Sequence, residues 1–334
     1  MLKKIIILLL GALLLIAIYF AGIKHLQSLS IEFQQPIYTV KPGSSVQSLC
    51  RHWQQLGQLT KADCFLLKLY SKLNPHLASV KQGSYRVSDD MSLLALLSLF
   101  REGNVAQFSL TFIEGQTLAQ ALQRLQFADY LHQDVLTAED VLELVDWPKE
   151  WGDKPDTAEG LLFPDTYYYT ADSKASSLIK RATSALIKQL AAAWQQRQID
   201  LPLQQPYQLL ILASIVEKES SYIPERTIVS SVFVNRLRKN MRLQTDPTVI
   251  YGIKNFDGDI KRSDLLNPHP YNTYRHAGLP PGPISLVSHT ALMAAGQPEV
   301  TDLYYFVSKG DGSHQFSTTL QQHNAAVQKY IFGK

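Results

Sequence analysis

Two glutamates stand two positions apart in the stretch SIVEKESSY, residues 214–222, which directly follows an apolar run. Burial disfavours the charged form of a carboxyl group and raises its pKa from about 4.3. A glutamate in an apolar wall therefore keeps its proton near neutral pH and can serve as a general acid. Glu217 and Glu219 are the two candidates for this chemistry.

The helical phase of the stretch separates the two acids. A helix is expected over about residues 206–221, and residues two apart on a helix point about 200° away from each other. Glu219 continues an aliphatic stripe that must be buried, whereas Glu217 continues a smaller and more polar set. The stripe consists of Leu212, Ile215 and Val216. We therefore expect Glu219 to be the catalytic acid, and Glu217 to be a structural partner of an arginine or a solvent-facing residue. The alternative for Glu219 is a helix end that simply meets water.

Two segments after this helix, residues 231–252 and 267–284, contain many polar and aromatic residues among turns. The relevant side chains are those of Gln244, Thr245, Asp246, Tyr251, Tyr271, Asn272, Thr273 and Tyr274. Such loops suit a saccharide, whose hydroxyl groups need hydrogen-bonding side chains and whose ring faces stack on aromatic rings. The alternative is that the loops close the fold and satisfy one another. The predicted substrate-binding residues are Ser220, Gln244, Asp246, Asn272 and Tyr274.

The N-terminus carries the strongest compositional signal. Lys3 and Lys4 precede residues 5–23, which contain no charge. At 1.5 Å per residue this run covers about 28 Å, enough to cross a hydrocarbon core of about 30 Å. The lysines favour a cytoplasmic tip, residues 1–4. The apolar run would then span the inner membrane once, and the rest of the chain would lie on the periplasmic side. A cleaved signal peptide is the alternative, but the run is longer than a usual signal core and no A-x-A site follows.

The charge balance and the histidine spacing argue against nucleic-acid binding and against a metal site. The chain has 334 residues, 46% of them hydrophobic, which is enough for about two domains. Its 32 basic and 29 acidic residues give a formal net charge of +3, so there is no electrostatic case for nucleic-acid binding. No metal or cofactor is predicted, because the histidines near the site lack the spacing of metal ligands. These are His269, His276, His289 and His314.

The pattern after the apolar run indicates a linker and three further regions. Residues 24–36 form a polar linker, and residues 36–105 have the order strand, helix, helix, strand, with Ser44 or Ser45 opening the first helix. Residues 106–157 are interpreted as a connecting region, and residues 158–334 as the catalytic domain. That domain is predicted to contain helices over about 176–198 and 225–239 and a hairpin at the Gly-Asp-Gly turn near the end.

The two cysteines, Cys50 and Cys64, lie fourteen residues apart on the two predicted helices of the 36–105 region. An exported location permits a disulfide. A bridge and two separate buried thiols both fit the sequence. Neither cysteine looks catalytic, because no histidine–carboxylate set accompanies it.

Several long motifs resemble the MltG/YceG-like family of membrane-anchored endolytic murein transglycosylases. They are LASIVEKESS (212–221), VFVNRLRKNMRLQTDPTVIYG (232–252), YNTYRHAGLPPGPI (271–284) and LYYFVSKGDGSHQFSTT (303–319). The phrase YTVKPGSSVQSLC (38–50) resembles the opening of a LysM module, a small βααβ unit that binds N-acetylglucosamine-containing glycans. The resemblance implies an α+β protein with a transmembrane helix, a LysM-like module and a lytic-transglycosylase-like catalytic domain.

The resemblance also implies a lysozyme-like site with one essential glutamate, Glu219. The implied reaction is non-hydrolytic cleavage of the β-1,4 bond between N-acetylmuramic acid and N-acetylglucosamine, which leaves a 1,6-anhydro end. Peptidoglycan strands are the implied substrate, and peptidoglycan synthases the implied partners in limiting strand length. Two alternatives remain open. A lysozyme-type hydrolase needs a second carboxylate, for which Asp165 and Asp246 are available. A non-enzymatic scaffold of wall synthesis would use only the LysM-like module.

Overall fold

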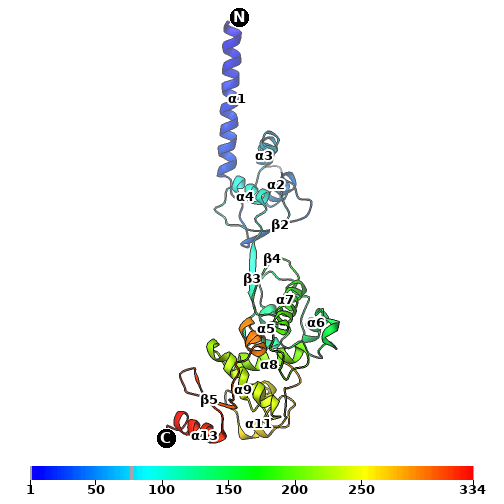
Figure 1. Ribbon diagram of the computed structural model, residues 1–334. Helices are drawn as coiled ribbons and strands as arrows, with labels where there is room; N and C mark the ends of the chain where they lie inside the picture. Colours follow the sequence, from blue (N-terminus) through cyan, green and yellow to red (C-terminus); the bar gives the residue numbers. More distant parts are fainter. Residues whose placement is uncertain (1, 76–78, 334) are drawn as a thin grey trace. The chain divides into compact units, whose positions relative to one another are not determined.

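The computed structural model describes residues 2–75 and 79–333 (Figure 1). The contacts divide the chain into two compact units, Met1–Phe108 and Ser109–Lys334. Both units mix helices with short two-stranded sheets. The mixed helix-and-strand fold expected from the sequence is therefore present.

The first unit begins with a long helix and continues in the predicted order. Its elements are α1 (Leu2–Ser28), β1 (Ile37–Val40), α2 (Val46–Gln55), α3 (Lys61–Leu73), β2 (Gly83–Arg86) and α4 (Leu93–Glu102). Among the described residues, α1 is the one helix long and apolar enough to cross a membrane. Strands β1 and β2 pair antiparallel, with Ile37 opposite Arg86 and Val40 opposite Gly83. The strand–helix–helix–strand order is confirmed, whereas a LysM-like function stays a prediction.

Capping residues and a disulfide define helices α2 and α3 of the first unit. Ser45 caps α2 and Thr60 caps α3, each with a reciprocal hydrogen bond from the residue three positions later. A disulfide joins Cys50 of α2 to Cys64 of α3, with the Cα atoms 5.7 Å apart. The structure thus decides between the bridge and the two thiols that the sequence left open. Trp53, Tyr85 and Phe100 are the largest side chains buried beside this bridge-linked pair.

The second unit starts where β3 (Gln107–Thr111) pairs with β4 (Thr166–Thr170). Between them lie α5 (Leu118–Gln126), α6 (Ala138–Glu143) and a 3-10 turn, η2 (Lys149–Trp151). Residues 109–157, interpreted from the sequence mainly as a connection, therefore pack within the same unit as the predicted catalytic domain. Some of the segment's apolar residues, among them Leu118 and Val141, are buried.

The rest of this unit is a helical cluster followed by a hairpin (Figure 1). Its elements are α7 (Ala175–Gln195), α8 (Pro206–Glu219), η3 (Ile223–Glu225), α9 (Arg226–Arg238), α10 (Asp246–Gly252), α11 (Arg262–Leu266), α12 (His289–Gly296), β5 (Tyr305–Ser308), β6 (His314–Ser317) and α13 (Leu320–Tyr330). The predicted long helices and the terminal hairpin are confirmed at nearly the expected positions.

Helix α8 is the centre of the cluster. It packs against α7, α9, α10 and α12. Proline at its first position suits a helix start, because the missing N–H would have no partner there. Every residue from Leu209 to Glu217 is buried. The helix is therefore enclosed on all sides, and not only along the aliphatic stripe that the sequence indicated.

Candidate active site

Helix α8 ends at Glu219 beside an open groove of about 810 Å³. Four segments of the second unit line this groove: the end of β3 with its following loop, the start of β4, the end of α8 and the turn that leads into α9. The acidic side chains among the lining residues are those of Glu114, Asp165, Glu217 and Glu219. The basic side chains among them are those of Lys218 and Arg226.

Glu219 has the protonation behaviour that a general acid needs. Its side chain is partly buried, and burial of the carboxyl raises its pKa to about 7. The hydrogen bond from the Thr245 hydroxyl to Oε1 opposes this rise, the negative charge of Asp246 adds to it, and the positive charge of Arg236 opposes it. At neutral pH the group therefore exists in both protonation states, so it can give up a proton and take one back.

Thr245 is held in place by a cluster of buried threonines. Its backbone N–H donates to Thr273 Oγ1 at 3.1 Å, and its carbonyl accepts from Thr248 Oγ1 at 2.8 Å. The hydroxyls of Thr248 and Thr273 lie 2.8 Å apart. The sequence marked Thr245 as a polar loop residue but did not pair it with Glu219. The only available signal was a hydroxyl residue directly before the Asp-Pro start of a helix.

Two of the predicted substrate-binding residues lie beside Glu219. The Tyr274 hydroxyl donates to Asp246 Oδ1 at 2.6 Å, and both residues interact electrostatically with Glu219. Burial raises the pKa of Tyr274, and the hydrogen bond to Asp246 adds to the rise. Tyr274 therefore stays a neutral donor. The pair is close enough to Glu219 to affect its pKa, but neither residue lines the groove.

The other three predicted binding residues have different surroundings. Asn272 is buried, and its amide donates to the carbonyls of Asp264, Leu265 and Asn267. Ser220 is also buried, and its hydroxyl donates to the Tyr222 carbonyl at 3.0 Å. These two residues organise loops, which is the alternative the sequence left open for polar residues there. Gln244 is exposed, with a left-handed φ of 48°. Their contact with a substrate stays a prediction.

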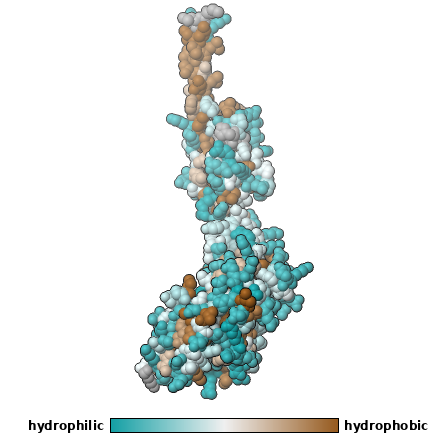
Figure 2. All heavy atoms as spheres, viewed as in Figure 1, coloured by the Kyte–Doolittle hydropathy of each residue, from teal (hydrophilic) through white to brown (hydrophobic). Residues whose placement is uncertain are grey.

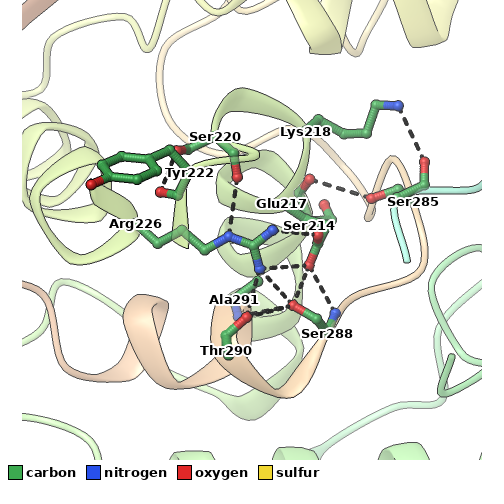
Figure 3. Close-up of polar contacts among 11 residues, drawn as sticks. Ser214, Glu217, Lys218, Ser220, Tyr222, Arg226, Ser285, Ser288, Thr290 and Ala291 are labelled. Atoms are coloured by element: carbon green, nitrogen blue, oxygen red, sulfur yellow. Dashed lines mark hydrogen bonds and ion pairs between the residues drawn. The ribbon is translucent and has the colours of Figure 1, made fainter. Parts of the chain in front are cut away.

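Glu217 forms a buried ion pair with Arg226 (Figure 3). The Arg226 Nη2 atom lies 2.7 Å from Glu217 Oε1, and Nη1 lies 3.2 Å from Oε2. Ser288 completes the site by donating its backbone N–H to Oε2 at 2.9 Å. The predicted arginine partner is confirmed, and the alternative of a solvent-facing residue is wrong. The physical reason is that α8 is enclosed on both faces, so a charge there needs a partner.

Arg226 also fixes the end of α8. Its Nε donates to the Ser220 carbonyl at 3.0 Å, and Nη1 donates to the hydroxyls of Ser288 and Thr290, each at 2.7 Å. Figure 3 shows the guanidinium between the last turn of α8 and these hydroxyls. Because Ser220 directly follows Glu219, this contact restrains the backbone that carries the candidate acid.

A second carboxyl group with a perturbed pKa lies at Glu159, which the sequence did not single out. Burial raises its pKa to about 7, although hydrogen bonds from the N–H groups of Leu118 and Gly160 and from the Tyr251 hydroxyl oppose the rise. Glu159 does not line the groove. It joins the start of α5 to the segment before β4, which is a structural position.

His289 and His314 have side-chain partners within this unit. His314 Nδ1 lies 2.8 Å from Glu225 Oε2, and His289 Nδ1 lies 2.9 Å from Gln189 Oε1. Over residues 2–75 and 79–333 no three His, Cys, Asp or Glu side chains gather in a way that could hold a metal ion.

Comparison with known proteins places the chain in a family. The sequence profile of the YceG-like family matches residues 38–329. A protein named endolytic murein transglycosylase from Bacillus subtilis (strain 168) is 31% identical over 271 residues, which are 75% of this chain and 73% of that protein. The protein of that name from Streptococcus pneumoniae serotype 2 is 26% identical, and the match covers 88% of this chain but 58% of that longer protein.

A solved structure agrees with this placement. The crystal structure of a yceG-like protein from Listeria monocytogenes superposes with a TM-score of 0.57 at 31% sequence identity, covering 87% of this chain and 98% of that one. The profile match extends over most of both units. The resemblance carried by the motifs around Glu219 is thereby confirmed, and the chain belongs to the YceG-like family.

Proposed function

We propose that this protein is an endolytic peptidoglycan transglycosylase that cleaves the β-1,4 bond between N-acetylmuramic acid and N-acetylglucosamine without water. The observation that carries the proposal is Glu219, a carboxyl with a pKa of about 7 at the end of a buried helix, beside a groove. The relatives named endolytic murein transglycosylases support the reaction class.

Glu219 acts first as an acid and then as a base. The protonated carboxyl donates its proton to the glycosidic oxygen as the bond to C1 of the muramic acid breaks. The resulting carboxylate then takes the proton of the 6-hydroxyl, whose oxygen bonds to C1 and closes the 1,6-anhydro ring. Thr245 donates to Oε1, which leaves Oε2 as the oxygen for proton transfer. Asp246 and Tyr274 orient the sugar beside it.

A lysozyme-type hydrolase is the second candidate, since two further carboxyl groups lie near Glu219 or on its groove. Asp165 lines the same groove as Glu219, and Asp246 is close enough to raise the pKa of Glu219. Hydrolysis with a paired carboxylate needs a separation of about 5–9.5 Å, depending on the stereochemistry. Either aspartate would then be as essential as the acid itself.

Product masses distinguish the two reactions. Purified full-length protein is incubated with peptidoglycan and with glycan strands stripped of peptides, and the ends are analysed by mass spectrometry. We expect ends lighter by one water than reducing ends, in the wild type and in Asp165→Asn and Asp246→Asn. Reducing ends, lost in either aspartate variant, would establish the hydrolase. Cleavage that persists in Glu219→Gln would rule out Glu219 as the acid, and a wild type without cleavage would leave only a non-enzymatic scaffold role.

We further propose that α1 anchors the protein in the inner membrane, with residues 1–4 in the cytoplasm and both units outside. An anchored cutter reaches new strands near their synthases and limits strand length. A chain that starts at residue 24 should keep its activity in solution but lose this restriction. The length distribution of newly made strands in cells with either form measures the difference.

A further inference from the structure

The first unit contains an apolar crevice of about 250 Å³ between α1 and α3. Six residues of α1 and four of α3 line it. They are Leu15, Ile18, Tyr19, Gly22, Ile23 and Leu26 on α1, and Leu66, Leu69, Tyr70 and Leu73 on α3. The crevice thus lies along a helix that is long and apolar enough to cross a membrane.

The crevice lies along the part of α1 that would be inside a membrane. Residues 5–23 are the uncharged run, and the lining residues from Leu15 to Ile23 lie inside it. At 1.5 Å per residue, Leu15 and Ile23 are separated by about 12 Å along the helix axis. Because the part of α3 from Leu66 to Leu73 packs beside this stretch, a bilayer around residues 5–23 would also reach that part of α3. The leaflet concerned is the one on the side of the folded units.

Helix α3 has the surface of a helix that lies in a lipid interface. Phe65, Leu69 and Leu73 follow one another at helical spacing, and they are 67%, 46% and 58% exposed. Lys68 and Lys72 are exposed, and helical spacing places them along one edge of this stripe. Lysines at such an edge extend their ammonium groups to lipid phosphates while their stems stay in apolar surroundings.

Three contacts hold α3 against α1 and α2. At the start of α3, Asp63 Oδ1 lies 2.6 Å from His25 Nε2. Just after its end, Asn74 Nδ2 donates to the Tyr19 hydroxyl at 3.4 Å. The Cys50–Cys64 disulfide ties α3 to α2. The start of α3 therefore lies beside His25, near the end of α1, and the last turn of α3 lies beside the uncharged run.

We propose that α3 is immersed in the leaflet on the side of the folded units, where phospholipid acyl chains fill the crevice and Lys68 and Lys72 bind anionic headgroups. The proposal rests on the membrane anchoring by α1. The supporting observation is that the crevice continues the apolar surface of α1. The helix that presents this surface in Figure 2 also forms one wall of the crevice. The lipid contact gives the first unit a fixed orientation at the membrane surface, which a flexible tether would not.

Acyl-chain contact can be measured by fluorescence quenching. Full-length Phe65→Trp and Leu69→Trp are reconstituted into vesicles of phosphatidylethanolamine and phosphatidylglycerol with brominated acyl chains. Leu56→Trp is the matched control, because Leu56 is 59% exposed on the same unit but lies outside α3. We expect the fluorescence added at positions 65 and 69 to fall at least twofold relative to unbrominated vesicles, and the fluorescence added at position 56 to be unchanged.

Each other outcome contradicts the proposal. Unquenched tryptophans at positions 65 and 69 would place α3 in water. Equal quenching at position 56 would mean that lipid contacts the first unit outside α3 as well, so the contact would not be specific to α3. Energy transfer between labelled copies without quenching would assign the crevice to a second copy. Loss of the protein from vesicles at alkaline pH would remove the anchoring on which the proposal rests.

The headgroup contact has its own measurement. With the bromines on phosphatidylglycerol alone, quenching at position 65 should exceed that with the same fraction of brominated phosphatidylethanolamine. The additional changes Lys68→Gln and Lys72→Gln should abolish the difference, and equal quenching by both lipids before these changes would overturn the lysine contact. Glycan cleavage by the same preparations reports the proposed enzyme function separately.

Discussion

The Arg226 guanidinium joins two residues at the end of α8, since it holds the Glu217 carboxylate at 2.7 Å and donates to the Ser220 carbonyl at 3.0 Å. Glu219 lies between these two attachment points. A buried ion pair adds little net stability compared with apolar residues of the same size. Its effect here is positional, because it restrains the backbone on both sides of the candidate acid.

Removal of Arg226 should be costly for stability. In Arg226→Met the Glu217 carboxylate stays buried without a positive partner, which costs about 3–5 kcal/mol. The double variant Arg226→Met with Glu217→Met should recover most of this loss, because no charge is then buried. Urea unfolding of the wild type, of Arg226→Met, of Glu217→Met and of the double variant in detergent gives the coupling energy. Equal destabilisation in the single and the double variant would contradict the ion-pair explanation.

Replacement of Glu219 by glutamine should abolish cleavage and leave the fold intact. A general acid contributes about 10²–10⁴-fold to a rate, and Glu219 acts in both proton transfers, so we expect at least the upper part of this range. Release of anhydro ends measures the rate, and circular dichroism checks the fold. Glu114→Gln is the matched control, since Glu114 lines the same groove. A comparable loss in the control would show that the groove does not depend on Glu219 alone.

The pH profile should respond in opposite directions to the two neighbours of Glu219. The Thr245 hydrogen bond lowers the pKa of Glu219 and the Asp246 charge raises it. Because the acid form starts the reaction, kcat/KM should fall as pH rises through about 7 in the wild type. Thr245→Val should move this alkaline limb to higher pH, and Asp246→Asn should move it to lower pH. Shifts of the same sign in both variants would rule out Glu219 as the group observed.

Glu159 should make folding stability depend on pH. Its pKa rises from 4.5, the ordinary value of a solvated glutamate, to about 7 in the folded chain, so the folded state binds more protons between these values. The resulting stability is fully present below about pH 4.5 and decreases by about 3 kcal/mol as pH rises through 7. Thermal unfolding at several pH values should show a flatter profile in Glu159→Gln. An unchanged slope would mean that other groups cause the dependence.

The sequence by itself determined the features that depend on neighbouring residues. The uncharged run 5–23 lies within α1, the serine and threonine caps begin α2 and α3, and the motif 212–221 ends α8 at Glu219. Helical spacing and caps act over a few residues, so a single chain reveals them. The long motifs also identified the family.

Only the tertiary structure decided the surroundings of each acid. Glu217 receives a hydrogen bond from Ser288, 71 positions away, and Glu219 receives one from Thr245, 26 positions away. Helical phase indicated a buried stripe but could not show that the opposite face of α8 is buried as well. Desolvation depends on every segment that packs around a group, and those segments come together only in the folded chain.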